Sequence, residues 1–583
     1  MDKRTIIAVV ASVLVITLGF VIQGALFAPE PVEPSAQDVE SEVPDTPPVV
    51  DPDAEPEPER ILGQVVPVED PDISQQPRTF SDRTTWEVTF SPIGGSITSF
   101  RLLQHLDEGE PVEMILRSDD SQRAFNLHFG GPEAPAVDAL FAFEQVNEWT
   151  YEFSRDFYIV GAEDEPFTLT KTYRFQPEEY LFELDVTVSN SVNEVVPLVF
   201  NGRAYTLSVG PQIGPEFESL DGRTDYRRFS ALIDNGRRDF NPRPATTETV
   251  QERVGWASLN GKYFAIIGIP GRAEYSIVFD KPIIEGLPEA AYLHFVRPTI
   301  GASTNTDTFR FFVGPKSAGV LDRYDNAEDN TFGVRDVNLG EVMDRRPLLG
   351  WLENGLKWIL QLFQSIVGNW GVAIIMLTIL VKAALFPLTR KSYKSNSKMQ
   401  ALAPKIKELK EKHKDNPQKA NTETAALYKK EGVNPLGGCL PLLLQLPFFL
   451  AMFGLFNNHF DLRGAVFIPG WISDLSAPES ILNFGSFTVP ILGWNDLRLL
   501  PIIYVGTQII TSKLTSNPNS SAGGNMKIMM YALPIVFFFI LYNMPSGLLV
   551  YWITTNALTA GQQYFYNRYK NRGGGQPVKP KGK

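Results

Sequence analysis

The chain has 583 residues, enough for several domains, and a formal net charge of −14 at pH 7. Residues 1–340 hold 27 Lys and Arg against 55 Asp and Glu, whereas residues 341–583 hold 26 against 12, which suggests two compartments or two kinds of partner. The single cysteine, Cys439, excludes an internal disulfide framework, and the chain lacks phosphate-binding glycine loops and clustered metal ligands. We therefore expect no catalytic residue, cofactor or metal, and no ATPase or dinucleotide chemistry.

The chain begins with a short segment, 1–5, followed by an apolar run over residues 6–27 that is long enough to span a bilayer. Lys3 and Arg4 precede the run, so the positive-inside rule predicts an uncleaved anchor with a cytoplasmic N-terminus; a cleaved signal peptide is the alternative. Residues 28–60 are rich in proline and acidic residues, which predicts a disordered, self-repelling tether.

From 61 to 340 apolar and polar residues alternate with period two in many short runs, such as Trp86–Phe90 and Tyr180–Val188. Gly94-Gly95 and Asn260-Gly261 supply turns between such runs. This pattern predicts a large β-sandwich, which would lie outside the inner membrane after an anchor of that orientation. Two functions are open for this domain: it serves as a scaffold or docking module, or it binds a sugar or a peptide in a groove of a sheet. The fold alone does not decide between these functions.

Residues 348–367 change to a helical period, with an apolar stripe opposite a polar face and with Trp351 and Trp358 suited to a headgroup boundary. We expect an amphipathic helix lying on the membrane, with packing against the sandwich as the alternative.

Five apolar segments follow, several of them short for a bilayer of about 30 Å. We predict transmembrane segments at 369–388, 439–456, 497–514, 528–542 and 547–565. The loop 389–434 has 12 basic and five acidic residues and the tail 566–583 has six basic residues and no acids, whereas the loop 457–496 has one basic residue and four acids. The charges place the basic loops with the N-terminus, which gives six spans with both termini in the cytoplasm and 457–496 in the periplasm.

Lys382 is the only charge in the first of these five segments, and none of the five contains Asp or Glu. A snorkelling lysine is one reading, but Lys382 stands about 12 Å of helix before Arg390, which is far for its side chain alone. We therefore expect Lys382 to face a wet pocket open to the cytoplasm. The polar residues of the spans are expected to line it or to contact a substrate: Thr378, Gln445, Gln508, Tyr551, Trp552, Thr555 and Asn556.

The loop 389–434 carries a narrow apolar stripe, a turn at Asp415-Asn416-Pro417 and a second helical stretch, which predicts a basic helical hairpin. It is either a solvated hairpin beside anionic lipid or a platform for ribosomal RNA or a polypeptide.

Four motifs carry a family resemblance: Gly368-Asn-Trp-Gly371; Phe386-Pro-Leu-Thr389; Asn434-Pro-Leu-Gly-Gly-Cys439 with Pro441 and Gln445; and Pro545-Ser-Gly-Leu548 followed by Tyr551. In order and spacing they resemble the YidC family of membrane protein insertases, in its Gram-negative type. The resemblance implies a multi-domain membrane protein with an N-terminal anchor, a periplasmic β-super-sandwich, and a five-span helical insertase core with a cytoplasmic helical hairpin. It also implies a hydrophilic groove with one basic residue, usually arginine in the family, at the position of Lys382.

The resemblance implies a non-enzymatic insertase and chaperone of the cell inner membrane that inserts nascent membrane proteins, alone or with the Sec translocon. Inner-membrane lipids and a ribosome bound through 389–434 and the C-terminal tail are further implied partners. Two other classes remain open: a solute transporter that uses Lys382 as a substrate or proton site, and a periplasmic binding or enzymatic module on a passive bundle.

Overall fold

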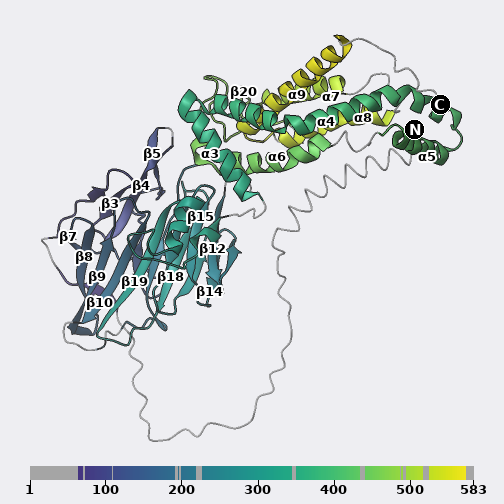
Figure 1. Cartoon of the computed structure of the whole chain (residues 1–583). Coiled ribbons are helices and arrows are strands. Elements are labelled where there is room, and N and C mark those ends of the chain that lie inside the picture. The colour runs from purple at the N-terminus through teal and green to yellow at the C-terminus, as the bar shows by residue number, and fades with distance from the viewer. Residues whose placement is uncertain are drawn as a thin grey trace, which may run out of the picture.

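The computed structural model describes residues 64–69, 73–107, 109–190, 195, 198–217, 226–343, 349–432, 440–485, 487–489, 494–515 and 524–572. The predicted anchor at 6–27 and tether at 28–60 lie outside these residues. Figure 1 shows a β-rich body, in purple to teal, beside an elongated helical body, in green to yellow.

The described residues of the β-rich domain form three antiparallel sheets, and the largest has ten strands. In order across that sheet the strands are β1 (Val65–Pro67), β8 (Thr150–Ile159), β9 (Ala162–Arg174), β10 (Leu181–Asn190), β19 (Thr304–Pro315), β16 (Phe264–Ile269), β15 (Trp256–Gly261), β12 (Arg227–Ile233) and β13 (Gly236–Phe240), with β7 (Ala142–Asn147) beside β8. The second sheet consists of β14 (Thr247–Val250), β17 (Ser276–Asp280), β18 (Tyr292–Pro298), β11 (Arg203–Val209) and β6 (Asn126–Phe129). The third consists of β2 (Arg78–Ser81), β3 (Trp86–Ser91), β4 (Ser96–Asp107) and β5 (Glu110–Glu113).

Both smaller sheets pack against one face of the large sheet, and aromatic rings fill the space between them. Phe90 of the third sheet lies 4.9 Å from Tyr173 of β9, measured between ring centroids. Phe295 of the second sheet lies 5.8 Å from Phe311 of β19. The period-two pattern of the sequence therefore corresponds to strands with one face turned into a shared core.

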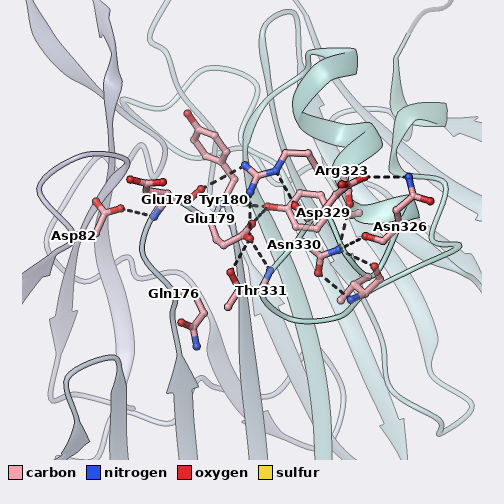
Figure 2. A network of polar contacts seen from close by, with 12 residues as sticks. Asp82, Gln176, Glu178, Glu179, Tyr180, Arg323, Asn326, Asp329, Asn330 and Thr331 are labelled. Atoms are coloured by element: carbon pink, nitrogen blue, oxygen red, sulfur yellow. Dashed lines mark hydrogen bonds and ion pairs between the residues drawn. The ribbon is translucent and has the colours of Figure 1, made fainter.

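A polar network fixes the segment that follows β19 and leads towards the helical body. This segment includes α2 (Ala318–Leu321), η1 (Asp322–Asp325) and η2 (Leu339–Val342). Figure 2 shows Glu179, only 3% exposed, at its centre. Its carboxylate accepts hydrogen bonds from the Tyr324 hydroxyl at 2.8 Å and the Thr331 amide at 2.8 Å, and pairs with Arg323 at 3.3 Å. These bonds hold the segment on the turn between β9 and β10.

The helical body consists of α3 (Gly350–Val367), α4 (Trp370–Lys412), α5 (Pro417–Lys430), α6 (Leu440–Asn458), α7 (Leu500–Thr515), α8 (Gly524–Leu541) and α9 (Ser546–Arg572). Between α6 and α7 lie η4 (Phe460–Leu462) and a small hairpin of β20 (Leu482–Asn483) and β21 (Asp496–Leu497). Leu356 and Leu360 of α3 are buried in the core of the helical body, whereas Trp351 and Trp358 on the same helix are exposed.

Two helices run past the ends expected from hydropathy. The segment predicted to end at 388 is part of α4, which continues to Lys412, and the segment predicted to end at 565 is part of α9, which continues to Arg572. The apolar run ends where the side chains become polar, but Lys and Arg favour helix almost as well as Leu, so the backbone does not change there. The expected hairpin therefore consists of the second half of α4 and of α5, which folds back along it.

Among the described residues, one helix has an apolar stretch of spanning length, Trp370–Pro387 in α4. Two shorter apolar stretches lie at Gln445–Phe456 in α6 and at Ala532–Leu541 in α8. Their outer faces are apolar, with Ile379, Leu446 and Ile535 among the exposed side chains.

The loop after α6 joins the helical body to the β-rich domain. Arg463 donates to both carboxylate oxygens of Asp107 on β4, at 2.7 and 2.9 Å, and its guanidinium lies 4.6 Å from the ring centroid of Phe217. Phe460 enters the β-domain core, with its ring 4.8 Å from that of Phe264. Beside it, burial lowers the pKa of His459 to about 4, although the charge of Asp461 acts in the opposite direction. We call this contact the domain joint.

Candidate functional site

Lys382 lies half-buried where three helices of the helical body meet, α4, α6 and α9. Its Nζ atom donates to Oγ1 of Thr559 on α9 at 3.0 Å and to Oε1 of Gln445 on α6 at 3.3 Å. Both acceptors are neutral, and no carboxylate occurs in the sequence of α6, α7, α8 or α9 or in residues 370–388. The positive charge of Lys382 is therefore hydrogen-bonded but not neutralised by an ion pair with these helices.

Thr559 accepts from Lys382 with its hydroxyl oxygen while its own hydroxyl proton is donated elsewhere. The hydroxyl donates to the carbonyl of Thr555 one helical turn earlier, at 2.7 Å. This bond orients the oxygen lone pairs of Thr559 towards α4, so a local α9 contact prepares the acceptor for a residue 177 positions away in the sequence.

The other residues predicted to line the site are divided between two environments. Thr378 is fully buried, and its hydroxyl donates to the Ile374 carbonyl at 2.7 Å. Tyr551 is buried in the core of the helical body. The structure thus brings Gln445 to Lys382 and the buried Tyr551 hydroxyl to Gln445 and Thr555, and it leaves Thr378 in the packed interior of the bundle.

An aromatic layer surrounds Trp552. Its ring stacks on Phe449 of α6 with centroids 4.6 Å apart and an interplanar angle of 3°, and it lies 5.4 Å from Tyr504 of α7. Phe537 of α8 meets the same indole edge-on at 6.2 Å. Trp552 therefore joins its own helix, α9, to α6, α7 and α8 by packing.

A second polar contact joins α7 to α9. Asn556 donates through Nδ2 to Thr507 Oγ1 at 3.3 Å, and its carbonyl accepts from Thr511 Oγ1 at 3.2 Å. Gln508, the α7 residue predicted to contribute, is half-buried beside these threonines. Thr555, one residue before Asn556, is buried.

Sequence reasoning missed Thr559 as a partner of Lys382, and it missed Thr507 and Thr511. Thr559 stands eight residues after Tyr551, at helical spacing on the same face as Thr555. That spacing placed Thr559 on a polar face, but only the crossing of α4 and α9 brings it to Lys382. Thr507 and Thr511, four residues apart on α7, carried the same signal.

The fold and the site together define a class: a bundle of apolar helices with a half-buried cation, attached to a large β-rich domain. The model of the 60Kd inner membrane protein family matches residues 362–573, and the YidC periplasmic domain model matches residues 82–353. The two matches divide the chain as the structure does, into a helical and a β-rich part.

Relatives along the whole chain point to the same family. A membrane protein insertase YidC of Treponema denticola is 39% identical, with 97% of this chain and 99% of the relative covered. Its counterpart from Treponema pallidum is 35% identical, covering 98% and 100%. The chain belongs to the YidC family of membrane protein insertases, and its β-rich part is the periplasmic domain.

Among solved structures, the crystal structure of an active YidC insertase with its first transmembrane domain resolved has 18% identity and a TM-score of 0.35, covering 87% of this chain and 95% of that one.

Proposed function

We propose that this insertase moves hydrophobic segments of nascent proteins into the inner membrane by attracting acidic residues of the accompanying polar tail to Lys382. The observation that carries the proposal is the pair of neutral acceptors, Gln445 and Thr559, around an ammonium group with no ion-pair partner in the spans. A lysine ammonium has three N–H donors, so these two bonds leave one for a substrate carboxylate.

The proposed arrangement is six spans with both termini in the cytoplasm. The anchor at 6–27 and tether at 28–60 precede the periplasmic domain at 61–340, and α3 lies at the periplasmic membrane surface. Lys382 stands 12 residues after Trp370, or about 18 Å along α4, so it lies past the middle of an apolar layer of about 30 Å. This depth on the cytoplasmic side suits a residue that receives a tail from the cytoplasm.

The groove would reduce the cost of dehydrating the polar tail of the substrate. Moving a polar group from water into hydrocarbon without compensation costs several kcal/mol. A hydrophilic groove around Lys382, reached through Gln445 and Thr559, would let the tail travel part of the way while hydrated. Short helices support the same idea, because α7 with its 16 residues is only about 24 Å long and would thin the bilayer locally.

Possible partners follow from the charged surfaces. The basic second half of α4, together with α5, offers a cytoplasmic platform for the ribosome, and the tail beyond α9 adds further positive charge. Operation with the Sec translocon belongs to the same proposal.

The test is insertion of a small, single-span protein with an acidic periplasmic tail into proteoliposomes, measured by protease protection. Lys382→Met keeps the length of the side chain and removes the charge, and Lys382→Arg keeps the charge. We expect Met to lower the insertion rate about tenfold, equivalent to about 1.4 kcal/mol, and Arg to stay within about threefold.

A matched substrate with Asn and Gln in place of its acidic residues serves as control and should be insensitive to Lys382→Met. Full insertion of the acidic substrate by Lys382→Met would contradict the charge mechanism. Loss of insertion of both substrates alike would favour a structural role for Lys382.

A further inference from the structure

The stretch from β20 up to the start of β21 carries no charged residue, in a chain rich in charge. Residues 481–495 contain no Asp, Glu, Lys or Arg, whereas 21% of the whole chain is charged. Three of its exposed side chains are large and apolar: Ile481 is 49% exposed, Leu482 55% and Phe487 60%. The small polar residues Asn483 and Thr488 are exposed beside them. A soluble surface loop of this length would ordinarily carry several charges, so this composition requires an explanation.

The base of the hairpin is fixed firmly to the helical body. Asp496 accepts from Ser480 Oγ at 2.8 Å and from Asn483 Nδ2 at 2.9 Å, which closes the two strands. Glu479 caps the start of α7 by accepting from the Leu500 amide at 2.7 Å. The exposed apolar side chains are therefore held out on a rigid base.

The apolar surface of the hairpin continues into that of α8. Trp494 stacks on Tyr542 with ring centroids 3.6 Å apart, and its ring lies 5.8 Å from that of Phe539. Phe539 is 50% exposed and the neighbouring Ile540 is 44% exposed on the outer face of α8. Tyr542 also donates through its hydroxyl to the Asp496 carbonyl at 2.6 Å, so it joins the end of α8 to the hairpin.

This continuity indicates what covers the apolar surface of the hairpin. In the described second half of α8 the exposed large side chains are apolar, namely Leu533, Ile535, Phe539 and Ile540, and in the proposed arrangement they face lipid acyl chains. A Trp–Tyr pair at the end of such a helix is typical of the boundary between hydrocarbon and headgroups. A surface that runs on from α8 past this boundary meets the same leaflet, because nothing charged interrupts it between residues 481 and 495.

We propose that the β20–β21 hairpin is an interfacial membrane anchor, which places Ile481, Leu482 and Phe487 among the lipids of the periplasmic leaflet. Insertion is shallow, about 5–10 Å, because strands with unpaired edges cannot enter the hydrocarbon interior. The hairpin holds the periplasmic ends of α7 and α8 at a fixed height. The inference rests on the bundle orientation given under the proposed function.

The test uses the full chain, with its one cysteine replaced (Cys439→Ser), in vesicles of phosphatidylethanolamine and phosphatidylglycerol. An environment-sensitive fluorophore is attached to Phe487→Cys. Ile540→Cys on α8 serves as the lipid reference, and Val160→Cys, exposed on the β-rich domain, serves as the water reference. Quenching is measured with aqueous iodide and with lipids that carry a nitroxide on the acyl chain.

We expect iodide to quench the Phe487 probe about fivefold less than the Val160 probe, and the nitroxide lipid to quench it within about twofold of the Ile540 probe. Iodide quenching equal to that at Val160 would overturn the proposal. Protection from both quenchers would overturn it as well, because it would indicate a protein partner. Iodide access at Ile540 would instead contradict the span arrangement, which separates failure of this inference from failure of the proposed function.

A second pair of variants checks the chemistry with the probe moved to Ile481→Cys. Phe487→Asp is expected to lower nitroxide quenching at least threefold, and Phe487→Leu to leave it unchanged, since only the former adds a charge to the inserted surface. Equal quenching in both variants would contradict lipid insertion. Unchanged thermal unfolding of both variants confirms that the base of the hairpin is intact.

Discussion

The ammonium groups of Lys171 and Lys382 have opposite chemical roles. Lys171 of β9 is 0% exposed and donates to the carbonyls of Gly94, Gly95 and Phe125, at 3.0, 2.7 and 2.7 Å, so all its N–H donors are used. Burial holds the pKa of Lys171 well below its usual range. Lys382 has two neutral acceptors within the described residues. Lys171 joins strand β9 to neighbouring segments through its hydrogen bonds, whereas Lys382 has one N–H group left to donate to another molecule.

Glu113 on β5 makes the stability of the β-rich domain depend on pH. Burial raises the pKa of Glu113 above its ordinary value of 4.5, and hydrogen bonds from Ser99, Phe100 and Ile115 act in the opposite direction. The folded domain therefore holds this proton more tightly than the unfolded chain, so the Glu113 contribution to stability grows as pH falls through the folded pKa.

We expect Glu113→Gln to remove this contribution to the pH dependence and to match or exceed the parent stability at pH 8, by about 1 kcal/mol. Glutamine keeps one oxygen for the two backbone amides. Urea unfolding of the detergent-solubilised protein between pH 5 and 8 measures the difference. Glu110→Gln, on the exposed side of the same strand, is the control. A parent that gains stability relative to Glu113→Gln as pH rises would contradict this sign.

At the scale of elements, hydropathy and helix ends are different properties. The sequence predicted the apolar stretch of α4, because composition alone determines where the chain tolerates lipid. It did not predict that α4 continues to Lys412, because the predicted end at 388 was the end of the apolar run and not the end of a helix. The helix continues since no glycine or capping residue stops it at 388. The site shows the same division. Lys382 could be found from its missing acidic partners, but Thr559 could not be assigned to it, because that contact depends on how α4 crosses α9.

The turn between α4 and α5 was predictable because its chemistry is local. Asn416 caps α5 by accepting from the Lys419 amide at 3.0 Å, and Pro417 is the first residue of the helix. We expect Asn416→Ala to destabilise α5 by about 1 kcal/mol and to speed its amide hydrogen exchange about fivefold. Asn421→Ala, exposed in the middle of the same helix, should slow exchange instead, since alanine is the better helix former. The same direction of change in both variants would contradict the capping role.

At the scale of the whole molecule, the domain joint depends on residues that local reasoning cannot pair. Asp107 and Arg463 are 356 positions apart, and in the sequence Arg463 was only the single basic residue of a loop. The β-rich domain itself was predictable from its alternation, because burial of one strand face leaves a periodic trace. Docking between domains leaves none, since it needs a few residues that meet only after both parts have folded.

We expect Arg463→Ala to loosen the joint by about 1.5–3 kcal/mol, the range for charge-assisted hydrogen bonds. Pulsed electron resonance between spin labels at Val160→Cys and Trp358→Cys, with Cys439→Ser, reports the distance between the two parts. The distribution should broaden in Arg463→Ala and stay narrow in Arg335→Ala, which removes an exposed arginine of the β-rich domain. An equally narrow distribution in both variants would show that the apolar contact of Phe460 suffices.

Within the described residues, the β-rich domain is tied to the helices at two separate points: the chain itself, through the segment bound by Glu179 that precedes α3, and the joint at Phe460 and Arg463. A body attached at one point can swivel about three axes, whereas one attached at two points can turn only about the line that connects them. Any swing of the periplasmic domain is thereby reduced to a single rocking motion. Such a motion leaves the loop after α6 in place, because this loop lies on the axis, so the end of the helix that carries Gln445 keeps its position while the far part of the periplasmic domain rocks.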